Sequence, residues 1–210
     1  VMRKLVEEVV VSNKYNNRKF CIASLFLAED KKGYEWLDYN SSIQSRPCDV
    51  TNSTLNIAKV ENMVAINSAI GVDLHGNIWA DSLKANNIYS GIGGQADFLR
   101  GANLSPGGVP IIAMKSKTKS GISKILEKSP EGITSTAIAA DPVVIVTEQG
   151  AFDPRGLSIC EHAVGIAHLA EEERRQELLR YIYDSEKFHK PRQALHDRCP
   201  KGFYPCPKDN

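Results

Sequence analysis

The chain has 210 residues, of which 42% are hydrophobic and 24% are charged, and its formal net charge is +1. This composition is typical of a globular protein with a substantial core. Acidic and basic residues are mixed along the chain, which argues against a nucleic-acid partner or an anionic membrane surface. No apolar run approaches the roughly 20 residues that a membrane-spanning helix needs, and the first residues show no secretory signal pattern.

The five cysteines are an odd number in a chain of ordinary core size, which predicts reduced thiols and an intracellular protein. Cys199 and Cys206 bracket the short loop CPKGFYPC, with His189 and His196 nearby. A zinc site there would need two further ligands. A surface tail is the simpler interpretation, and no metal site is predicted.

The first predicted element is a helix, because Val1, Leu5, Val6 and Val9 have helical spacing. No N-cap residue precedes them, so we expect the helix to begin in sequence before this chain. KFCIASLFLA (19–28) predicts a buried strand, and GYEWLDYN (33–40) predicts a helix.

Three further runs, at 63–76, 108–116 and 142–151, are strand-like, and each ends at glycine or a polar cluster. Helices are predicted at 53–60, at 95–101 and across 158–184, with a break near 168–171. Strands that alternate with helices predict an α/β fold with an open, mostly parallel sheet flanked by helices. Ligands of such folds bind at the loops beyond the strand ends.

The stretch YSGIGGQADFLRGA (89–102) is unusually rich in small residues. Gly91, Gly93 and Gly94 expose peptide N–H groups that no side chain shields, so an anion or a strained carbonyl oxygen could approach them. Gln95 adds a polar side chain. The spacing is not the dinucleotide-binding fingerprint. A tight turn without a ligand remains the alternative to a binding site.

Glu148 follows the apolar run VVIVT, which delivers a carboxylate to the end of a probable central strand. A partly desolvated acid there suits an acid, base, nucleophile or positioning role. The alternative is a turn residue that pairs with a lysine such as Lys119. The loop around Lys119 is either a solvated basic loop or a phosphate contact. Asn52 is expected to cap the following helix, and His168 is expected to be a hydrogen-bonded structural residue.

Four motifs, in this order and at these separations, resemble one known family: MVAINSAIGVDLHGNIWADS, SGIGGQADFLRGANLSPGG, VVIVTEQGAFDPRGLS and GIAHLAEEER. They are similar to the C-terminal domain of the acetyl-CoA hydrolase and 4-hydroxybutyrate CoA-transferase family. We therefore assign residues 1–184 to such a domain and 185–210 to an extended C-terminal tail.

The resemblance implies a CoA-transferase that moves coenzyme A between an acyl-CoA and a small carboxylate of the acetate, butyrate or 4-hydroxybutyrate type. The reaction would pass through an enzyme glutamyl-CoA thioester, with coenzyme A as co-substrate and no permanently bound cofactor. The nucleophilic glutamate and the family's N-terminal domain would precede Val1. The chain is therefore expected to be inactive alone, to pair with its own N-terminal domain, and to form a homodimer in the cytoplasm or, in a eukaryote, in mitochondria.

The resemblance also implies roles for individual residues. Gly94 would donate its amide to an oxyanion, and Glu148 would line the catalytic pocket. Asn52 would contact the bound carboxylate, and Lys119 would lie near the glutamyl-CoA linkage. Contacts with substrate or coenzyme A are expected at Asn52, Gly91, Gly93, Gln95 and Lys119.

Two other functions stay open at this point. An acyl-CoA hydrolase would use the same site, with water in place of the second acid. A non-catalytic module that binds acyl-CoA or another anion would show binding without turnover, and a dinucleotide-binding domain is a more distant alternative.

Overall fold

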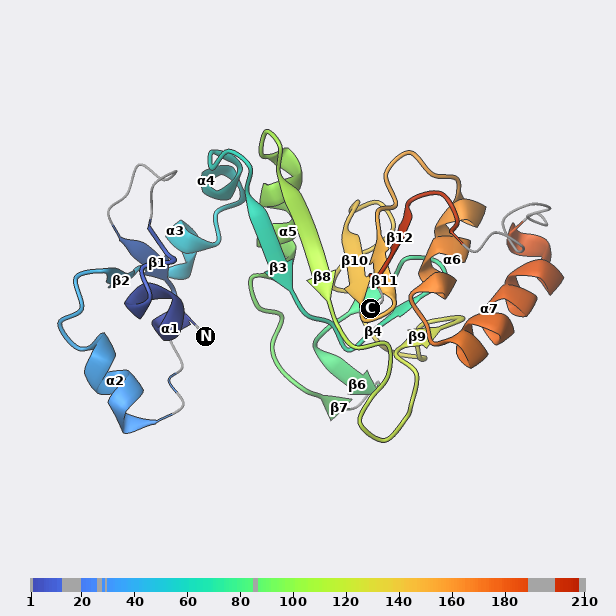
Figure 1. Ribbon diagram of the computed structural model, residues 1–210, viewed down its shortest axis with the longest axis horizontal. Coiled ribbons are helices and arrows are strands. Elements are labelled where there is room, and N and C mark those ends of the chain that lie inside the picture. Colours follow the sequence, from blue (N-terminus) through green and yellow to red (C-terminus); the bar gives the residue numbers. More distant parts are fainter. Residues whose placement is uncertain are drawn as a thin grey trace.

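The computed structural model describes residues 2–12, 20–25, 28, 30–84, 87–188 and 199–207 (Figure 1). Its helices are α1 (Met2–Glu7), α2 (Lys31–Leu37), α3 (Cys48–Thr51), α4 (Thr54–Ala58), α5 (Gln95–Leu104), α6 (Ile159–His168), α7 (Glu172–Asp184) and the 3-10 helix η1 (Glu186–Phe188). Its strands are β1 (Cys21–Ala23), β2 (Ile43–Ser45), β3 (Val64–Asn67), β4 (Gly71–Asp73), β5 (Ile78–Trp79), β6 (Ser82–Lys84), β7 (Asn87–Ile88), β8 (Val109–Ala113), β9 (Ile125–Leu126), β10 (Val144–Thr147), β11 (Gly150–Phe152) and β12 (Phe203–Pro205).

The main sheet has five strands in the order β12-β11-β10-β8-β3. Strands β3, β8 and β10 are parallel, whereas β10–β11 and β11–β12 are antiparallel. The predicted α/β class with flanking helices is confirmed, and the sheet is mixed. The antiparallel part arises because only Glu148 and Gln149 separate β10 from β11, and so short a connection forms a hairpin.

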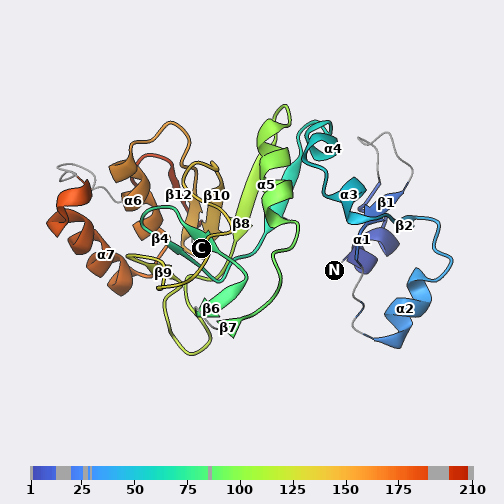
Figure 2. The same cartoon turned by 180° about the vertical axis from the view of Figure 1, so that it is seen from behind.

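Helix α5 covers one face of β3 and β8, since it lies behind these strands in Figure 1 and in front of them in Figure 2. Helices α6 and α7 lie at the other end of the sheet, near β11 and β12 (Figure 1). Helix α6 begins with a capping box, in which Ser158 and Glu161 bond to each other's backbone N–H groups. Leu169 ends α6, and α7 starts at Glu172, so the predicted break is confirmed.

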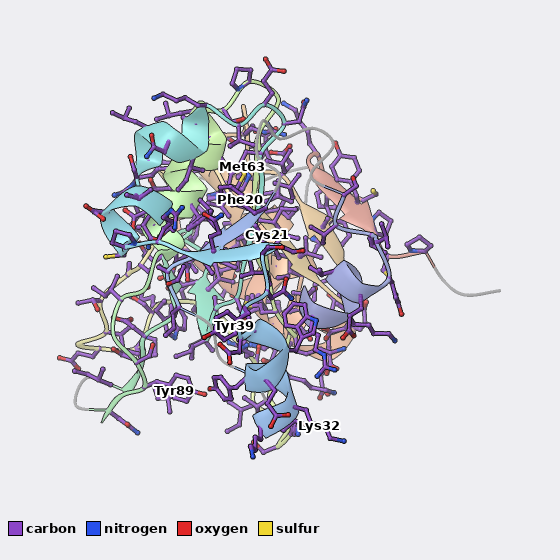
Figure 3. The ribbon with its side chains drawn as sticks, turned by 90° about the vertical axis from the view of Figure 1, so that its left-hand side faces the viewer. Phe20, Cys21, Lys32, Tyr39, Met63 and Tyr89 are labelled. Carbon is purple, nitrogen blue, oxygen red and sulfur yellow. The ribbon has the colours of Figure 1, made fainter. Side chains whose placement is uncertain are left out.

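The N-terminal elements form a group beside the main sheet (Figures 1 and 2). Strands β1 and β2 pair in parallel with each other. The buried strand predicted over 19–28 is wrong in its extent and burial, because β1 has three residues and all are half-buried. Residues 19, 26, 27 and 29 lie outside the described residues. Figure 3 views this side, with Phe20 and Cys21 at β1 and Lys32 on α2.

The helix predicted over 53–60 corresponds to α4, but its cap differs from the prediction. Ser53 accepts the hydrogen bond from the Asn56 N–H group, whereas Asn52 ends the preceding helix α3. Asn52 is therefore not the N-cap of α4. Its side chain is available for another contact.

One hydrophobic core joins the sheet to α5, α6 and α7, and it includes the fully buried side chains of Ile112, Ile145 and Phe152. Part of the segment after residue 184 belongs to this core. Phe203 on β12 is 5% exposed and Phe188 in η1 is 2% exposed. Strand β12 thus forms one edge of the main sheet. No helix among the described residues is long and apolar enough to cross a membrane.

Helix α6 packs on β11 through Gly165, which lies against the ring of Phe152. A Cβ atom at Gly165 would collide with the ring of Phe152. Alanine normally stabilises a helix interior by about 1 kcal/mol relative to glycine. Here we expect Gly165→Ala to destabilise the protein by about 1–3 kcal/mol, because overpacking outweighs helix propensity.

The measurement is the urea concentration at the midpoint of unfolding. Ile159→Ala in the same helix is the control, because Ile159 is 74% exposed and its loss should change the midpoint little. A higher midpoint for Gly165→Ala would contradict the close packing of α6 on β11.

Candidate functional site

The glycine-rich stretch forms the loop between β7 and α5, with Gly94 as the N-cap of α5. A Cβ atom at Gly91 or Gly93 would meet nothing within 4 Å, and neither glycine has a positive φ. Both are exposed, with open space beside them. A Cβ atom at Gly94 would collide with the side-chain amide of Asn52. A larger residue at position 94 would therefore force the end of the Asn52 side chain to move, whereas the backbone conformation there suits any residue.

Asn52 reaches this loop from the end of α3. Its Oδ1 accepts a hydrogen bond of 2.8 Å from the Thr51 hydroxyl, and its Nδ2 is the atom that lies nearest to the Cβ position of Gly94. The structure thus brings together two of the predicted site residues. The amide group of Asn52 lies directly against the start of α5.

A cavity of about 270 Å³ opens beside the loop. Within the described residues, no hydrogen bond uses the amide N–H groups of Gly93 and Gly94. Such N–H groups at the start of a helix attract negative charge. The cavity is lined by Asn67, Ser68, Ala80, Asp81, Ser90, Gly91, Ile92, Gly93, Gly94, Gln95 and Thr136.

Two buried polar side chains in the cavity wall lack a full set of partners among the described residues. Gln95 and Asp81 are each 8% exposed, and neither Gln95 Nε2 nor Asp81 Oδ1 has a hydrogen-bond partner there. The main-chain oxygen of Asp81 accepts from the N–H groups of Tyr89 and Ser90, which fixes the start of the loop. Asp81 was missed by the sequence analysis, although an acid directly after the short run NIWA was a usable signal.

Glu148 lies in the turn between β10 and β11 and is held by Ser116. The Ser116 N–H group lies 3.1 and 3.2 Å from the two carboxylate oxygens, and the Ser116 hydroxyl donates to Oε1. Partial burial of Glu148 opposes its ionisation, but the hydrogen bonds and the charge of Lys115 outweigh that effect and hold the pKa of Glu148 below its ordinary value. Glu148 is therefore an ionised, oriented carboxylate.

Lys119 lies in the loop that follows β8, and its side chain is exposed. Among the ion pairs of the described residues none joins Lys119 to Glu148, although Glu148 does lie in a turn, as the alternative to a functional role expected. Besides Lys115, Lys124 also interacts with Glu148 electrostatically, and the sequence analysis did not single it out. Lys124 lines a second cavity, which shares Ser68 and Ala80 with the first.

No histidine is found among the described residues that line the two cavities. His168 is 3% exposed in α6, and its Nδ1 lies 2.9 Å from the main-chain oxygen of Val164. The structural interpretation of His168 is confirmed. Among the described residues, no cluster of three or more His, Cys, Asp or Glu side chains could hold a metal ion.

The chain is similar to known proteins over most of its length. Residues 30–182 match the family described as acetyl-CoA hydrolase/transferase C-terminal domain. The chain is 35% identical to the 4-hydroxybutyrate coenzyme A transferase of Clostridium kluyveri over 83% of this chain and 42% of that protein. It is 36% identical to the butyryl-CoA:acetate CoA-transferase of Anaerostipes caccae over 77% of this chain and 36% of that protein.

Solved structures give the same result. RipA from Yersinia pestis has 34% sequence identity and a TM-score of 0.77, over 85% of this chain and 40% of that chain. The chain spans less than half the length of each of these relatives. The match extends over most of the described fold, including the glycine loop, Asn52 and Glu148. The chain therefore belongs to the acetyl-CoA hydrolase/transferase family.

Proposed function

We propose that this chain forms the acyl-binding part of an enzyme that transfers coenzyme A from an acyl-CoA to a small carboxylic acid. The observation that carries the proposal is the N-terminal turn of α5, where Gly94 lies against the Asn52 amide at the wall of a cavity. The relatives named 4-hydroxybutyrate and butyryl-CoA:acetate CoA-transferases support this class of reaction.

The proposed nucleophile is a glutamate carboxylate from a preceding domain, which is also the proposed partner of this chain. Its oxygen attacks the thioester carbon of the acyl-CoA, and the C–S bond breaks to give a mixed anhydride and the coenzyme A thiolate. The thiolate then attacks the glutamyl carbonyl and releases the first acid. The acceptor acid reverses both steps and leaves as the new acyl-CoA, which regenerates the glutamate.

Negative charge develops on the carbonyl oxygen in each of these attacks. The unused N–H groups at Gly93 and Gly94, together with the Asn52 Nδ2 group, are placed to donate hydrogen bonds to that oxygen or to the carboxylate product. Fixed donors stabilise such charge without reorganisation, and one donor is worth about 3 kcal/mol. Gly91 and Gly93 leave the surrounding space open for the acyl group.

Glu148 has a different role in this proposal. Both of its oxygens accept hydrogen bonds from Ser116, so the carboxylate is stabilised and oriented rather than poised for attack. Glu148 therefore acts as a positioning residue that fixes the loop after β8, which also carries Lys119.

The test uses the longest natural polypeptide that contains this chain, incubated with butyryl-CoA and labelled acetate. Formation of labelled acetyl-CoA is expected, and borohydride should convert one glutamate to an alcohol that mass spectrometry locates outside residues 1–210. Acetate-independent release of butyrate would instead identify a hydrolase. Binding of butyryl-CoA without any turnover would identify a non-catalytic module, and a label on Glu148 would contradict its positioning role.

Gly94→Ala tests the close contact at the start of α5. The added Cβ would displace the Asn52 amide from the start of α5, and the loss of one donor should lower kcat on the order of 100-fold. Steady-state transfer rates give the measurement. Leu104→Ala, at the exposed end of the same helix, is the control and should retain full activity.

A double variant separates the contact from a general loss of structure. If Gly94→Ala acts by displacing Asn52, then adding Asn52→Ala should cost little further activity, because both changes remove the same interaction. Independent, additive losses would show that the two residues do not act together.

Glu148→Gln tests the ionised carboxylate. Because the native state holds the pKa of Glu148 below its ordinary value, the ionised group stabilises the fold at neutral pH, and this contribution is lost as the pH falls below about 4.5 toward the native pKa. The melting temperature of Glu148→Gln should therefore lie below that of the unmodified chain at pH 7, and the difference should shrink at pH 3.

Thermal unfolding at both pH values gives the measurement. The exposed Glu131 forms no hydrogen bond or ion pair among the described residues, so Glu131→Gln is the matched control. A constant difference between Glu148→Gln and the unmodified chain at both pH values would mean that the carboxylate charge does not stabilise the fold.

A further inference from the structure

A second cavity of about 370 Å³ adjoins the glycine loop and shares two wall residues with the first cavity. This volume is within the range of small-ligand sites, which are mostly apolar with a few placed polar groups. Its wall has that composition. The cavity is lined by Ser68, Ala69, Ile70, Ala80, Leu83, Tyr89, Thr118 and Lys124.

Among the described residues that line this cavity, Lys124 is the one with a charged side chain, and its backbone is hydrogen-bonded on both sides. Its main-chain N–H group donates to the Ser116 oxygen at 2.8 Å, and its main-chain oxygen accepts from the Val72 N–H group at 3.0 Å. Its Nζ atom donates to the main-chain oxygen of Ala69 at 2.8 Å. The ammonium group is therefore held beside another residue of the cavity wall.

The ammonium group has capacity for a further partner. It carries three N–H donors, and the bond to Ala69 uses one. Within the described part of the chain, no carboxylate lies at ion-pairing distance from Lys124. Burial lowers the pKa of Lys124, while the charge of Glu148 acts in the opposite direction. A half-buried cation without an ion-pair partner gains most from a bound anion.

We propose that Lys124 binds the carboxylate of a short-chain aliphatic acid in this second cavity. Ile70 and Leu83 contact its alkyl chain, and the hydroxyl of Thr118 lies in the same wall. Tyr89 also lines this cavity and is 73% exposed. This subsite rests on the proposed CoA transfer, because it would hold the acceptor acid beside the glycine loop.

The wall chemistry also defines the class of acid. One cation balances one carboxylate, and no second basic side chain lines the cavity within the part of the chain that the structure describes. The apolar residues favour an alkyl chain, and Glu148 repels additional negative charge near Lys124. The subsite therefore selects monocarboxylates such as butyrate over dicarboxylates such as succinate.

Binding is tested on the chain itself by NMR, with labelled lysine side chains and labelled Ile and Leu methyl groups. Butyrate should shift the Lys124 Cε signal and the methyl signals of Ile70 and Leu83 together, and succinate should bind more weakly. Lys124→Met keeps the apolar stem but removes the charge, and it should weaken butyrate binding by about tenfold or more. Lys128→Met removes an exposed lysine outside the cavity and should leave the affinity unchanged.

Lys124→Arg retains the positive charge, so it shows whether a loss of affinity in Lys124→Met comes from the missing charge or from a change in the fold. It should keep part of the butyrate affinity, and the backbone spectra of all three variants should match that of the unmodified chain. Equal butyrate affinity in Lys124→Met and the unmodified chain would overturn the subsite. So would methyl shifts confined to residues outside the cavity.

The outcome for the subsite can be told apart from the outcome for the proposed function. CoA transfer by the longer polypeptide with an unchanged KM for butyrate in Lys124→Met would overturn the subsite and leave the function standing. Butyrate binding at Lys124 in a protein that transfers no CoA would overturn the function and leave the binding site standing.

Discussion

The hydrogen bonds of Ser116 hold the functional region together. Ser116 is 1% exposed, and it donates through its N–H and hydroxyl groups to Glu148 while its main-chain oxygen accepts from Lys124. Through these bonds Ser116 connects Glu148, in the β10–β11 turn, to Lys124, at the far end of the loop that follows β8. Ser116 is therefore hydrogen-bonded to both charged residues. The position of Lys124 is also fixed by its bonds with Val72 and Ala69.

The parallel part of the sheet explains why these groups meet. Strands β3, β8 and β10 run side by side with Asn67 level with Ile112 and Ala113 level with Val146. Their carboxyl ends therefore lie at one edge, where Ser68, Ser116 and Glu148 follow the three strands within a few residues. Ligands of α/β sheets bind at this edge. The glycine loop lies at this edge too, because it shares the first cavity with Asn67 and Ser68 at the end of β3.

The sequence predicted the helices over 95–101 and 158–184, the α/β class, and the glycine loop, because each depends on local patterns of spacing and turn residues. It did not predict the contact between Asn52 and Gly94, which joins residues far apart in the chain. It also favoured Lys119 over Lys124. Which lysine of the loop turns inward depends on the pairing of Lys124 with Val72 and Ser116, and no local pattern contains that information. Strand β12 was missed because its flanking prolines are typical of a loop.

Those prolines have a consequence for the behaviour of the protein at high concentration. Strand β12 covers the edge of β11, with Phe203 level with Phe152 and Pro205 level with Gly150. Proline has no N–H group, so the outer border of β12 offers a poor template for another strand. If β12 left the sheet, the β11 border would be open to pairing between molecules. Strand β12 thus covers an edge that could otherwise associate with another copy, in addition to completing the main sheet.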